Sequence, residues 1–497
     1  MSALQMPPQD ATIFDVRHHG ARGDGRTLDT ASINAAILAA ARCGGGTVLI
    51  PAGRYLCFTL RLRSNVSITF APGAVIEAAD PALHPGRYDP PDGNSRVFYQ
   101  DFGHSHWRNS LIWGDEVENV VLAGPGLIDG KGLTRNGPVA RWRAETGERP
   151  LSMRGMSANE LARLEPDIAA MDGLGNKAIA LKAGRNITIS GLTLQNCGHF
   201  AILATGARAL TLRDLMIDTN RDGIDLDCVC DALVERCRVN TPNDDAIVVK
   251  SSYALGRAIA AENIVIRDCH VSGFDLGTMV DGTRGTTQQL APDRDRVTGR
   301  IKLGTESNGG YRNILIEDCS FTRSRGLALE TVDGGVMEGI IARRLTMREV
   351  TSAPLFLRLG NRARGPVGTG VGAMRDIRIE SVTATGIDPR YAVTLAGLAG
   401  HPIEHVALHD IALTYRGGAA PADAVATPPE LASAYPEPSM FGPTPAWGLW
   451  MRYARGVTLD DVRLATERGD PRPAIVADDV TALTVENTPT WHAKRLT

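Results

Sequence analysis

The 497-residue sequence has few aromatic side chains, little net charge and no long apolar run. Aromatic residues make up 5% and the formal net charge is −3, so the chain offers no broad basic surface for a nucleic acid. No segment approaches the roughly 18 apolar residues that a membrane-spanning helix needs. We therefore expect no nucleic acid and no membrane among the partners of the chain.

Motifs that bind cofactors or metals are also missing. The sequence has no Gly-x-Gly-x-x-Gly after a strand, no phosphate-binding loop and no His-Glu-x-x-His. Its 8 cysteines do not form a double Cys-x-x-Cys pattern, and we expect them to be reduced thiols that pack as small apolar groups. The sequence thus predicts no cofactor and no metal.

The first residues, MSALQMPPQDATIFDV, have neither the basic nor the apolar segment of a secretory leader. As written, the sequence predicts a cytoplasmic protein, and a periplasmic or secreted one if a leader has been removed. No feature of the sequence indicates the oligomeric state.

What the chain does have is a repeated apolar unit. Successive units begin at Asn186, Ala209 and Asp231, at intervals of 23 and 22 residues, which is typical of one coil of a solenoid. The last position of each unit predicts one interior ladder: Leu192, Leu215, Cys237, Cys269, Cys319, Leu345, Val382, Ile411 and Val462.

A second strand follows each unit, as in DGIDLDCV and DDAIVVKS. Alternation predicts that Ile224, Leu226, Ile247, Val249, Ile301, Leu303, Leu327 and Leu329 point inward. We expect the other residues of these strands to form an exposed cleft floor: Asp225, Asp227, Val248, Lys250, Lys302, Ala328, Glu330, Phe356 and Arg358.

We interpret residues 1–497 as one elongated solenoid domain. Residues 13–75 form an N-terminal cap and the first coils, with a helix that begins at Asp29 or Thr30 and ends at Gly44. Residues 80–176 are insertions that wall the cleft, with a helix over about 158–171, and 177–470 are the main coils. Residues 417–447 are rich in Pro and Ala but contain apolar side chains, so we expect a covering loop and not a solvated linker.

Three acidic residues fall at matching places in consecutive coils. Asp222 lies in one coil and Asp244 and Asp245 in the next, which places them about 4.8 Å apart along the axis. Repulsion between neighbouring carboxylates raises the pKa of at least one of them, so that one group stays protonated while another is ionised. A carboxylic acid beside a carboxylate is the equipment that cleaves a glycosidic bond.

The sequence FDVRHHGARGDGRTLDTASINAAILAAARCGGGTVLIPAGRY resembles the N-terminal cap of pectin-degrading right-handed β-helix enzymes. The core resembles glycoside hydrolase family 28, the polygalacturonase and rhamnogalacturonan hydrolase family. LETVDGG, FLRLGNRARG and AYPEPSMFG are similar to its bacterial rhamnogalacturonan-type subgroup. The resemblance implies an all-β, right-handed parallel β-helix of the pectin-lyase-like kind, with an N-terminal capping helix and long loop insertions.

The catalytic motifs of that family match Asn220, Arg221 and Asp222, and Asp244 and Asp245. The resemblance implies that Asp244 is the general acid and that Asp222 and Asp245 activate water. The family inverts the anomeric configuration, for which we expect carboxyl groups ~6.5–9.5 Å apart.

Two family motifs are altered. Gly299, Arg300 and Ile301 replace Gly-His-Gly, and Ala328, Leu329 and Glu330 replace Arg-Ile-Lys, so the cations that grip a galacturonate carboxylate are lost. Either Arg300 and Lys302 restore the positive charge, or the subsite takes a neutral sugar such as rhamnose. The candidate substrate-binding residues are Asn220, Lys250, Arg300, Lys302, Glu330, His199 and Arg358.

Simpler interpretations remain for some of these residues. Glu330 and Arg358 could form a structural salt bridge, and His199 could be a hydrogen-bonded polar residue. For the whole chain we expect an inverting, exo-acting hydrolase that removes galacturonic acid or rhamnose from pectin-derived oligosaccharides. The alternatives are a uronate lyase and a structural β-helix in which the aspartates only cap turns.

Overall fold

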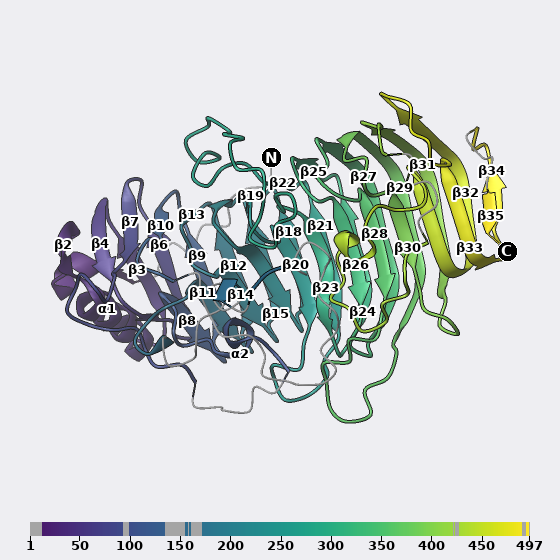
Figure 1. The fold of residues 1–497 in the computed structure, drawn as a ribbon. Coiled ribbons are helices and arrows are strands. Elements are labelled where there is room, and N and C mark those ends of the chain that lie inside the picture. Colours follow the sequence, from purple (N-terminus) through teal and green to yellow (C-terminus); the bar gives the residue numbers. More distant parts are fainter. Residues whose placement is uncertain are drawn as a thin grey trace.

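The computed structural model describes residues 12–92, 99–134, 155–157, 159–160, 171–420, 422, 427–489 and 494–496. Its strands stack as the coils of one elongated parallel solenoid, with an N-terminal helix at one end (Figure 1). The strands form three ladders along the solenoid, and each coil from β3 to β26 contributes one strand to each ladder. The predicted all-β fold with parallel pairing is confirmed.

Ladder 1 carries the second strands of the predicted coils. In order, it consists of β5 (Leu60–Arg61), β8 (Ile112–Asp115), β11 (Lys177–Lys182), β14 (Phe200–Thr205), β17 (Asp222–Asp227), β20 (Ile247–Ser251), β23 (Ile301–Ser307), β26 (Leu327–Thr331), β28 (Leu355–Leu359) and β30 (Val393–Ala396), continued by the start of β32 (Leu449–Thr466), β33 (Ile475–Thr481) and β35 (Lys494–Leu496).

Ladder 2 carries the repeated apolar units. It consists of β1 (Ile13–Asp15), β3 (Gly46–Ile50), β6 (Val66–Phe70), β9 (Glu118–Ala123), β12 (Arg185–Ser190), β15 (Arg208–Arg213), β18 (Cys230–Glu235), β21 (Ala261–Arg267), β24 (Tyr311–Glu317), β27 (Val336–Arg348), β29 (Ala373–Ile387), β31 (Ile403–Tyr415), the middle of β32 and β34 (Thr484–Glu486).

Ladder 3 is made of short strands that follow these units. It consists of β2 (Asp24–Leu28), β4 (Gly53–Cys57), β7 (Ala74–Ala78), β10 (Leu127–Asp129), β13 (Thr193–Gln195), β16 (Met216–Asp218), β19 (Arg238–Asn240), β22 (His270–Ser272) and β25 (Ser320–Thr322). From β27 onward, ladders 2 and 3 join in single long strands.

The sharp bend before each unit of ladder 2 explains why so many units begin with Asn or Asp. Asn186, Asn263 and Asn313 have φ of 54°, 56° and 52°, in the left-handed region that these short polar residues tolerate. Their side chains also stack between coils: Asn186 Nδ2 donates to Asn119 Oδ1 at 2.7 Å, and Asn313 Nδ2 donates to Asn263 Oδ1 at 2.8 Å.

The N-terminal cap follows the prediction closely. Helix α1 (Thr30–Arg42) begins after Asp29, ends before Gly44, and buries Ile33, Ala36, Ile37 and Ala40 against the first coils. The Asp29 carboxylate accepts the backbone N–H groups of Arg22 and Gly23, not those of the helix. The helix thus covers core that the first coil would otherwise expose.

The predicted interior is confirmed at every position. All nine residues of the predicted ladder, from Leu192 to Val462, are buried, as are all eight inward residues of ladder 1 from Ile224 to Leu329. Seven of the 8 cysteines are buried as free thiols, and Cys43 is exposed.

The predicted exposed floor on ladder 1 is wrong in one respect. The register is as expected, because Asp225 aligns through Val248, Lys302 and Ala328 to Phe356. These outward side chains are all buried, because long connections pack over them. One connection contains α2 (Phe102–Ser105), and the other contains the short helix η5 (Pro438–Phe441), both drawn over ladder 1 in Figure 1.

In the described part of the loop at 417–447, Met440 and Phe441 pack onto the solenoid. Most of the helix predicted over about 158–171 lies outside the described residues. Among the residues that the structure describes, no helix is long and apolar enough to span a membrane.

Candidate active site

The three aspartates meet where ladder 3 turns into ladder 1. Asp222 opens β17, and the turn with Asp244 and Asp245 precedes β20 in the next coil; the Gly223 N–H donates to the Asp245 carbonyl at 3.0 Å. One oxygen of each carboxyl group lies within 4.8 Å of the other two. The predicted stacking of these carboxylates is therefore present.

Asp222 is the most enclosed of the three. It is 3% exposed, its Oδ2 lies 3.4 Å from Lys250 Nζ, and its Oδ1 has no hydrogen-bond partner in the described structure. Lys250 is held at the same time by Asp225 Oδ2, at 2.8 Å, and contacts His104. A buried carboxyl oxygen without a partner is unusual in a purely structural residue.

Asp244 lies in a different environment, at the opening of the site. Its Oδ2 accepts a hydrogen bond from Arg221 Nε at 2.9 Å, and its side chain is 26% exposed. Thr241 Oγ1 donates to the Asp244 carbonyl at 2.8 Å and fixes the turn. Arg221 is the middle residue of the motif Asn220, Arg221 and Asp222, and it binds Asp244 of the next coil.

These environments separate the pKa values of two neighbouring carboxyl groups. Burial and then the negative charge of Asp244 raise the pKa of Asp222 well above its usual range. Burial alone would also raise the pKa of Asp244, but the charge of Arg221, its hydrogen bond to Asp244 and the charge of Lys250 lower it. These opposite directions favour Asp222 as the protonated member of the pair, the reverse of the order that the family resemblance implies.

The separation of the carboxyl groups also differs from the expectation. Oxygens within 4.8 Å of one another are closer than the ~6.5–9.5 Å expected for inversion, so that prediction is wrong for the protein without substrate. The spacing by itself therefore does not determine the stereochemical outcome.

Arg300 and Asp245 belong to a buried ionic network. Arg300 Nε donates to Asp245 Oδ1 at 2.6 Å, and its two terminal nitrogens donate to Glu437, at 2.9 and 2.5 Å. Arg325 Nη1 lies 3.4 Å from Glu437. Glu437 comes from the covering loop, so Arg300 is not a spare cation: it links that loop to Asp245.

Lys302 and Glu330 form a second buried pair, with Nζ 3.3 Å from Oε2. Lys302 Nζ also lies 3.6 Å from Asp245 Oδ2 and packs over the ring of Tyr435. Burial raises the pKa of Glu330 to about 7 although Lys302 and Arg300 oppose this. Its Oε1 is buried and has no hydrogen-bond partner among the described residues.

The suggested Glu330–Arg358 salt bridge is wrong. The two residues are neighbours in register, but Arg358 donates instead to the backbone carbonyls of Gly397, Glu430 and Leu431 at 3.1, 2.8 and 3.0 Å. Arg358 therefore anchors the covering loop, and no observation places it against a substrate.

The two remaining candidates differ from each other. Asn220 Oδ1 accepts from Asn243 Nδ2 at 2.8 Å, so its amide joins neighbouring turns. His199 is buried, stacks on Phe200 and has no partner for either ring nitrogen within the described part of the chain, so it is not a satisfied polar residue. Burial, and then nearby Arg221, lower the pKa of His199 well below its usual value, so the ring is neutral.

Two family models match parts of the chain. One, described as a right handed beta helix region, matches residues 169–289, and the other, described as rhamnogalacturonase A/epimerase, pectate lyase-like, matches residues 13–88. An exo-poly-alpha-D-galacturonosidase of Dickeya chrysanthemi is 21% identical over 372 residues, which cover 70% of this chain and 57% of that protein. A polygalacturonase of Chamaecyparis obtusa is 24% identical over 335 residues, or 63% of this chain and 55% of that protein.

The chain is thus similar in sequence to polygalacturonases over 63–70% of its length. It spans about half the length of these curated relatives. The chain also shares its fold with solved structures. It superposes on an exopolygalacturonase of Thermotoga maritima with a TM-score of 0.61, at 18% identity and over 93% of both chains. The polygalacturonase of Erwinia carotovora gives 0.56, at 19% identity over 83% of this chain and 96% of that one.

Sequence reasoning did not identify several residues of the site. His104, Glu437 and Tyr435 lie in insertions without periodicity, and no local signal marks them. Glu306 could have been found, because strand alternation continues outward from Lys302 to this residue. It lies 3.9 Å from Lys250 and 3.2 Å from Arg362.

Among the described residues, two groups of side chains could hold a metal by proximity: His104, Asp222 and Asp225, and the three aspartates 222, 244 and 245. In the first group, the Lys250 ammonium is already bound to both aspartates. In the second, Arg221 and Arg300 each bind one carboxylate. Cationic side chains therefore already supply the positive charge that a metal would bring.

Proposed function

We propose that the chain is a glycoside hydrolase that removes a terminal sugar from pectin-derived oligosaccharides, including those of rhamnogalacturonan. The observation that carries the proposal is the pair of adjacent carboxyl groups whose pKa values are shifted in opposite directions. A protonated Asp222 beside an ionised Asp244 is the acid and base combination that glycosidic cleavage requires.

The reaction needs no further group. A carboxylic acid gives its proton to the leaving oxygen as the glycosidic C–O bond breaks, and a carboxylate takes a proton from the water whose oxygen bonds to the anomeric carbon. The pKa order in the free protein favours Asp222 as the acid, whereas the family resemblance favours Asp244. Asp245, held by Arg300 and Lys302, is the third carboxylate beside the reacting atoms.

Exo action is supported by the way both ends of the ladder 1 face are filled. At the N-terminal end, Trp107 packs on Phe200 and Leu203. At the C-terminal end, apolar side chains of the covering loop and ladder 1 pack together: Ala328, Phe356, Met440, Phe441 and Trp450. Between these ends, the charged side chains Asp225, Lys250, Lys302 and Glu330 lie on β17, β20, β23 and β26. A site of this length accommodates the end of a sugar chain better than its middle.

The ion pairs favour a neutral sugar over β23 and β26. Arg300 is matched by Asp245 and Glu437, and Lys302 by Asp245 and Glu330, so neither cation is left for a galacturonate carboxylate. This supports rhamnose as the released sugar, with galacturonic acid as the other candidate.

The test is incubation with oligogalacturonides and rhamnogalacturonan oligosaccharides of defined ends. Mass spectrometry identifies the released sugar and NMR its anomeric configuration. Release of one terminal sugar, abolished by Asp222→Asn and by Asp244→Asn, is the expected result. Absence of release from every end would contradict the proposal.

The two alternatives have less support. A lyase needs a base beside Cα of the uronate, and both candidate cations, Arg300 and Lys302, are bound to carboxylates. A structural role would have the aspartates cap turns, but Asp222 Oδ1 and Asp225 Oδ1 are buried without partners among the described residues. An unsaturated product would reveal the lyase.

A further inference from the structure

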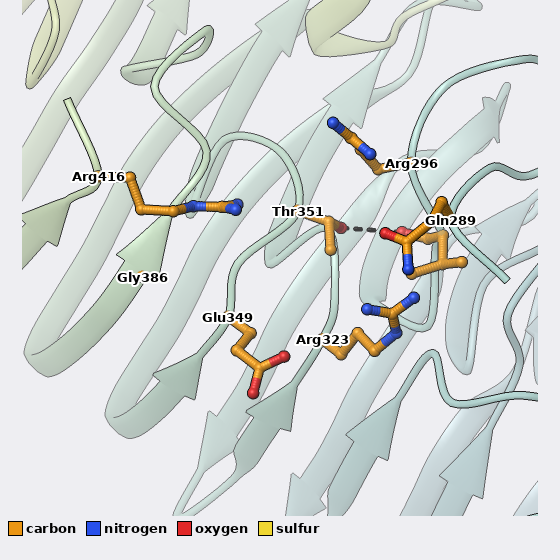
Figure 2. A pocket seen from close by; sticks show the side chains of 8 residues that line it. Gln289, Arg296, Arg323, Glu349, Thr351, Gly386 and Arg416 are labelled. Carbon is orange, nitrogen blue, oxygen red and sulfur yellow. Dashed lines mark hydrogen bonds between the residues drawn. The ribbon is translucent and has the colours of Figure 1, made fainter. Parts of the chain in front are cut away.

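An arginine-lined pocket lies outside the proposed catalytic site. It has a volume of about 320 Å³, at the lower end of the ~300–1,000 Å³ typical of small-molecule sites. The side chains that matter for its chemistry are Gln289, Arg296, Arg323, Glu349, Thr351 and Arg416 (Figure 2). We call this the arginine pocket.

The pocket follows the same edge of the solenoid as the catalytic aspartates. Arg323, Thr351 and Arg416 lie in or at the start of the connections from ladder 3 to ladder 1, as Asp222 and Asp244 do in earlier coils. The turn of Thr351 is three coils beyond that of Asp244, so the two are separated by roughly 14 Å along the axis. A sugar chain held at the catalytic site can therefore extend along this edge.

Three arginines and one glutamate line the pocket. In Figure 2, Arg416 reaches in from one side and Arg296 and Arg323 from the other, with Glu349 on the same side of the pocket as Arg323. Arg323 is fixed, because its Nε donates to the Gly273 carbonyl at 3.2 Å and its Nη2 to the Thr286 and Gln288 carbonyls. Because these acceptors are neutral backbone carbonyls, they do not neutralise the positive charge of Arg323.

Arg296 and Arg416 differ from the other arginines on this edge. Arg300, Arg325 and Arg390 each bind a carboxylate, whereas the side chains of Arg296 and Arg416 have neither an ion pair nor a hydrogen bond to any described residue. Two extended, unmatched guanidinium groups and a third that is anchored in place form a site for a planar anion.

The remaining polar groups identify what the anion is attached to. Thr351 Oγ1 uses its proton on the Val297 carbonyl, at 2.8 Å, and can only accept further hydrogen bonds. Gln289 donates one amide hydrogen to the Thr286 carbonyl, at 2.8 Å, which leaves its oxygen as an acceptor and its second N–H as a donor. With the Glu349 carboxylate, these acceptors require donors on the ligand. Inorganic phosphate has few or none, whereas an acidic sugar has hydroxyl groups beside its carboxylate.

We infer that the arginine pocket is a second carbohydrate-binding site that holds the carboxylate of a uronate residue outside the catalytic site. The inference rests on the proposed function for the origin of this ligand, a pectic oligosaccharide whose terminal sugar is cleaved elsewhere. It separates two tasks: recognition of acidic sugars in the arginine pocket, and cleavage beside the ion-paired Arg300 and Lys302.

The experiment measures binding directly, so that it does not depend on hydrolysis. The full chain with Asp222→Asn is titrated by calorimetry with tri-galacturonate, with its methyl ester and with inorganic phosphate. The same titrations are made with Arg296→Gln and Arg416→Gln added together. Arg238→Gln, an exposed arginine on β19, is the matched control.

We expect the double arginine variant to bind tri-galacturonate about tenfold to a hundredfold more weakly, the effect of losing charge-assisted hydrogen bonds. Esterification of the ligand should have the same effect, and Arg238→Gln should have none. Equal binding by the double variant, equal binding of the ester, phosphate that binds as tightly as the sugar, or no binding at all would each overturn the inference. Binding as expected in a chain without hydrolase activity would refute the proposed function alone.

Discussion

The outer side of ladder 1 changes its chemistry half-way along the molecule. Asp225 and Lys302 occupy the same column of the register as Ala328, Phe356 and Trp450, and all five are buried. Over the first stretch, the side chains are charged and several polar atoms lack partners; over the second, apolar rings fill the space. All five residues thus have the same position in their coils, and their side chains decide whether that position belongs to a site or to apolar packing. We call the apolar cluster of Ala328, Phe356 and Trp450 with Met440 and Phe441 of the covering loop the plug.

The two stretches also differ in what they contribute to stability. A buried Trp or Phe stabilises the fold by about 1.5–3 kcal/mol or more through the apolar area removed from water. Buried ion pairs contribute little net free energy, because desolvation offsets their attraction. The plug and the interior ladder therefore stabilise the scaffold, and the charged stretch is held in place by them.

The largest effect should come from the two carboxyl groups with opposite pKa shifts. Asp222→Asn and Asp244→Asn should each lower kcat by about 10²–10⁴-fold, the usual contribution of an acid or base. A substrate with a good leaving group, such as an aryl glycoside, should restore activity only to the variant that lacks the general acid. Asp214→Asn, on an exposed ion pair with Arg236, is the control. Full activity of either variant would remove it from the mechanism.

The plug should respond in stability. Trp450→Ala removes a ring that is 1% exposed and packs edge-on against Phe441 at 4.9 Å. We expect the free energy of unfolding to fall by about 3–5 kcal/mol in a denaturant titration. Val367→Ala, at a fully exposed position, should change it by less than about 0.5 kcal/mol.

The same plug should set the product pattern. Phe441→Ala should open the C-terminal end of the face and increase the share of products longer than one sugar, as seen by mass spectrometry. An unchanged pattern of single sugars, in a variant that stays folded, would show that the plug does not determine exo action.

Arg221 should control the acid side of the pH profile. The guanidinium holds the pKa of Asp244 low, so Arg221→Gln should raise it by about one to three pH units. If Asp244 must be ionised, the rising limb of kcat/KM shifts to higher pH by that amount and the falling limb stays. A shift of the falling limb alone would instead assign the proton to Asp244 in the reacting complex.

Glu330 should give the smallest effect. Its pKa of about 7 means that it is mostly neutral below pH 7 and gains a negative charge above it. For a substrate with an acidic terminal sugar, KM should therefore rise a few-fold between pH 6 and 8, and Glu330→Gln should flatten this rise. A substrate with a neutral terminal sugar provides the comparison and should show little change.

Much of the site could be predicted because it follows from the repeat. Apolar periodicity fixed which residues point inward, and the same period placed Asp222 level with Asp245 in the next coil. The connections that pack over ladder 1 could not be predicted in this way. His104 and Glu437 are 146 and 137 residues away in sequence from the side chains they contact, Lys250 and Arg300, and they lie in connections with no period.

The amino-acid sequence by itself determined the solenoid, its interior ladder, the cap helix and the alignment of three carboxyl groups, because these depend on local alternation and a coil of constant length. The tertiary structure alone decided that ladder 1 is covered, that Arg300 and Lys302 are already ion-paired, and that Asp222 is enclosed while Arg221 binds Asp244. Burial and ionisation depend on which distant segments pack over a residue, and hydrophobic periodicity carries no information about that.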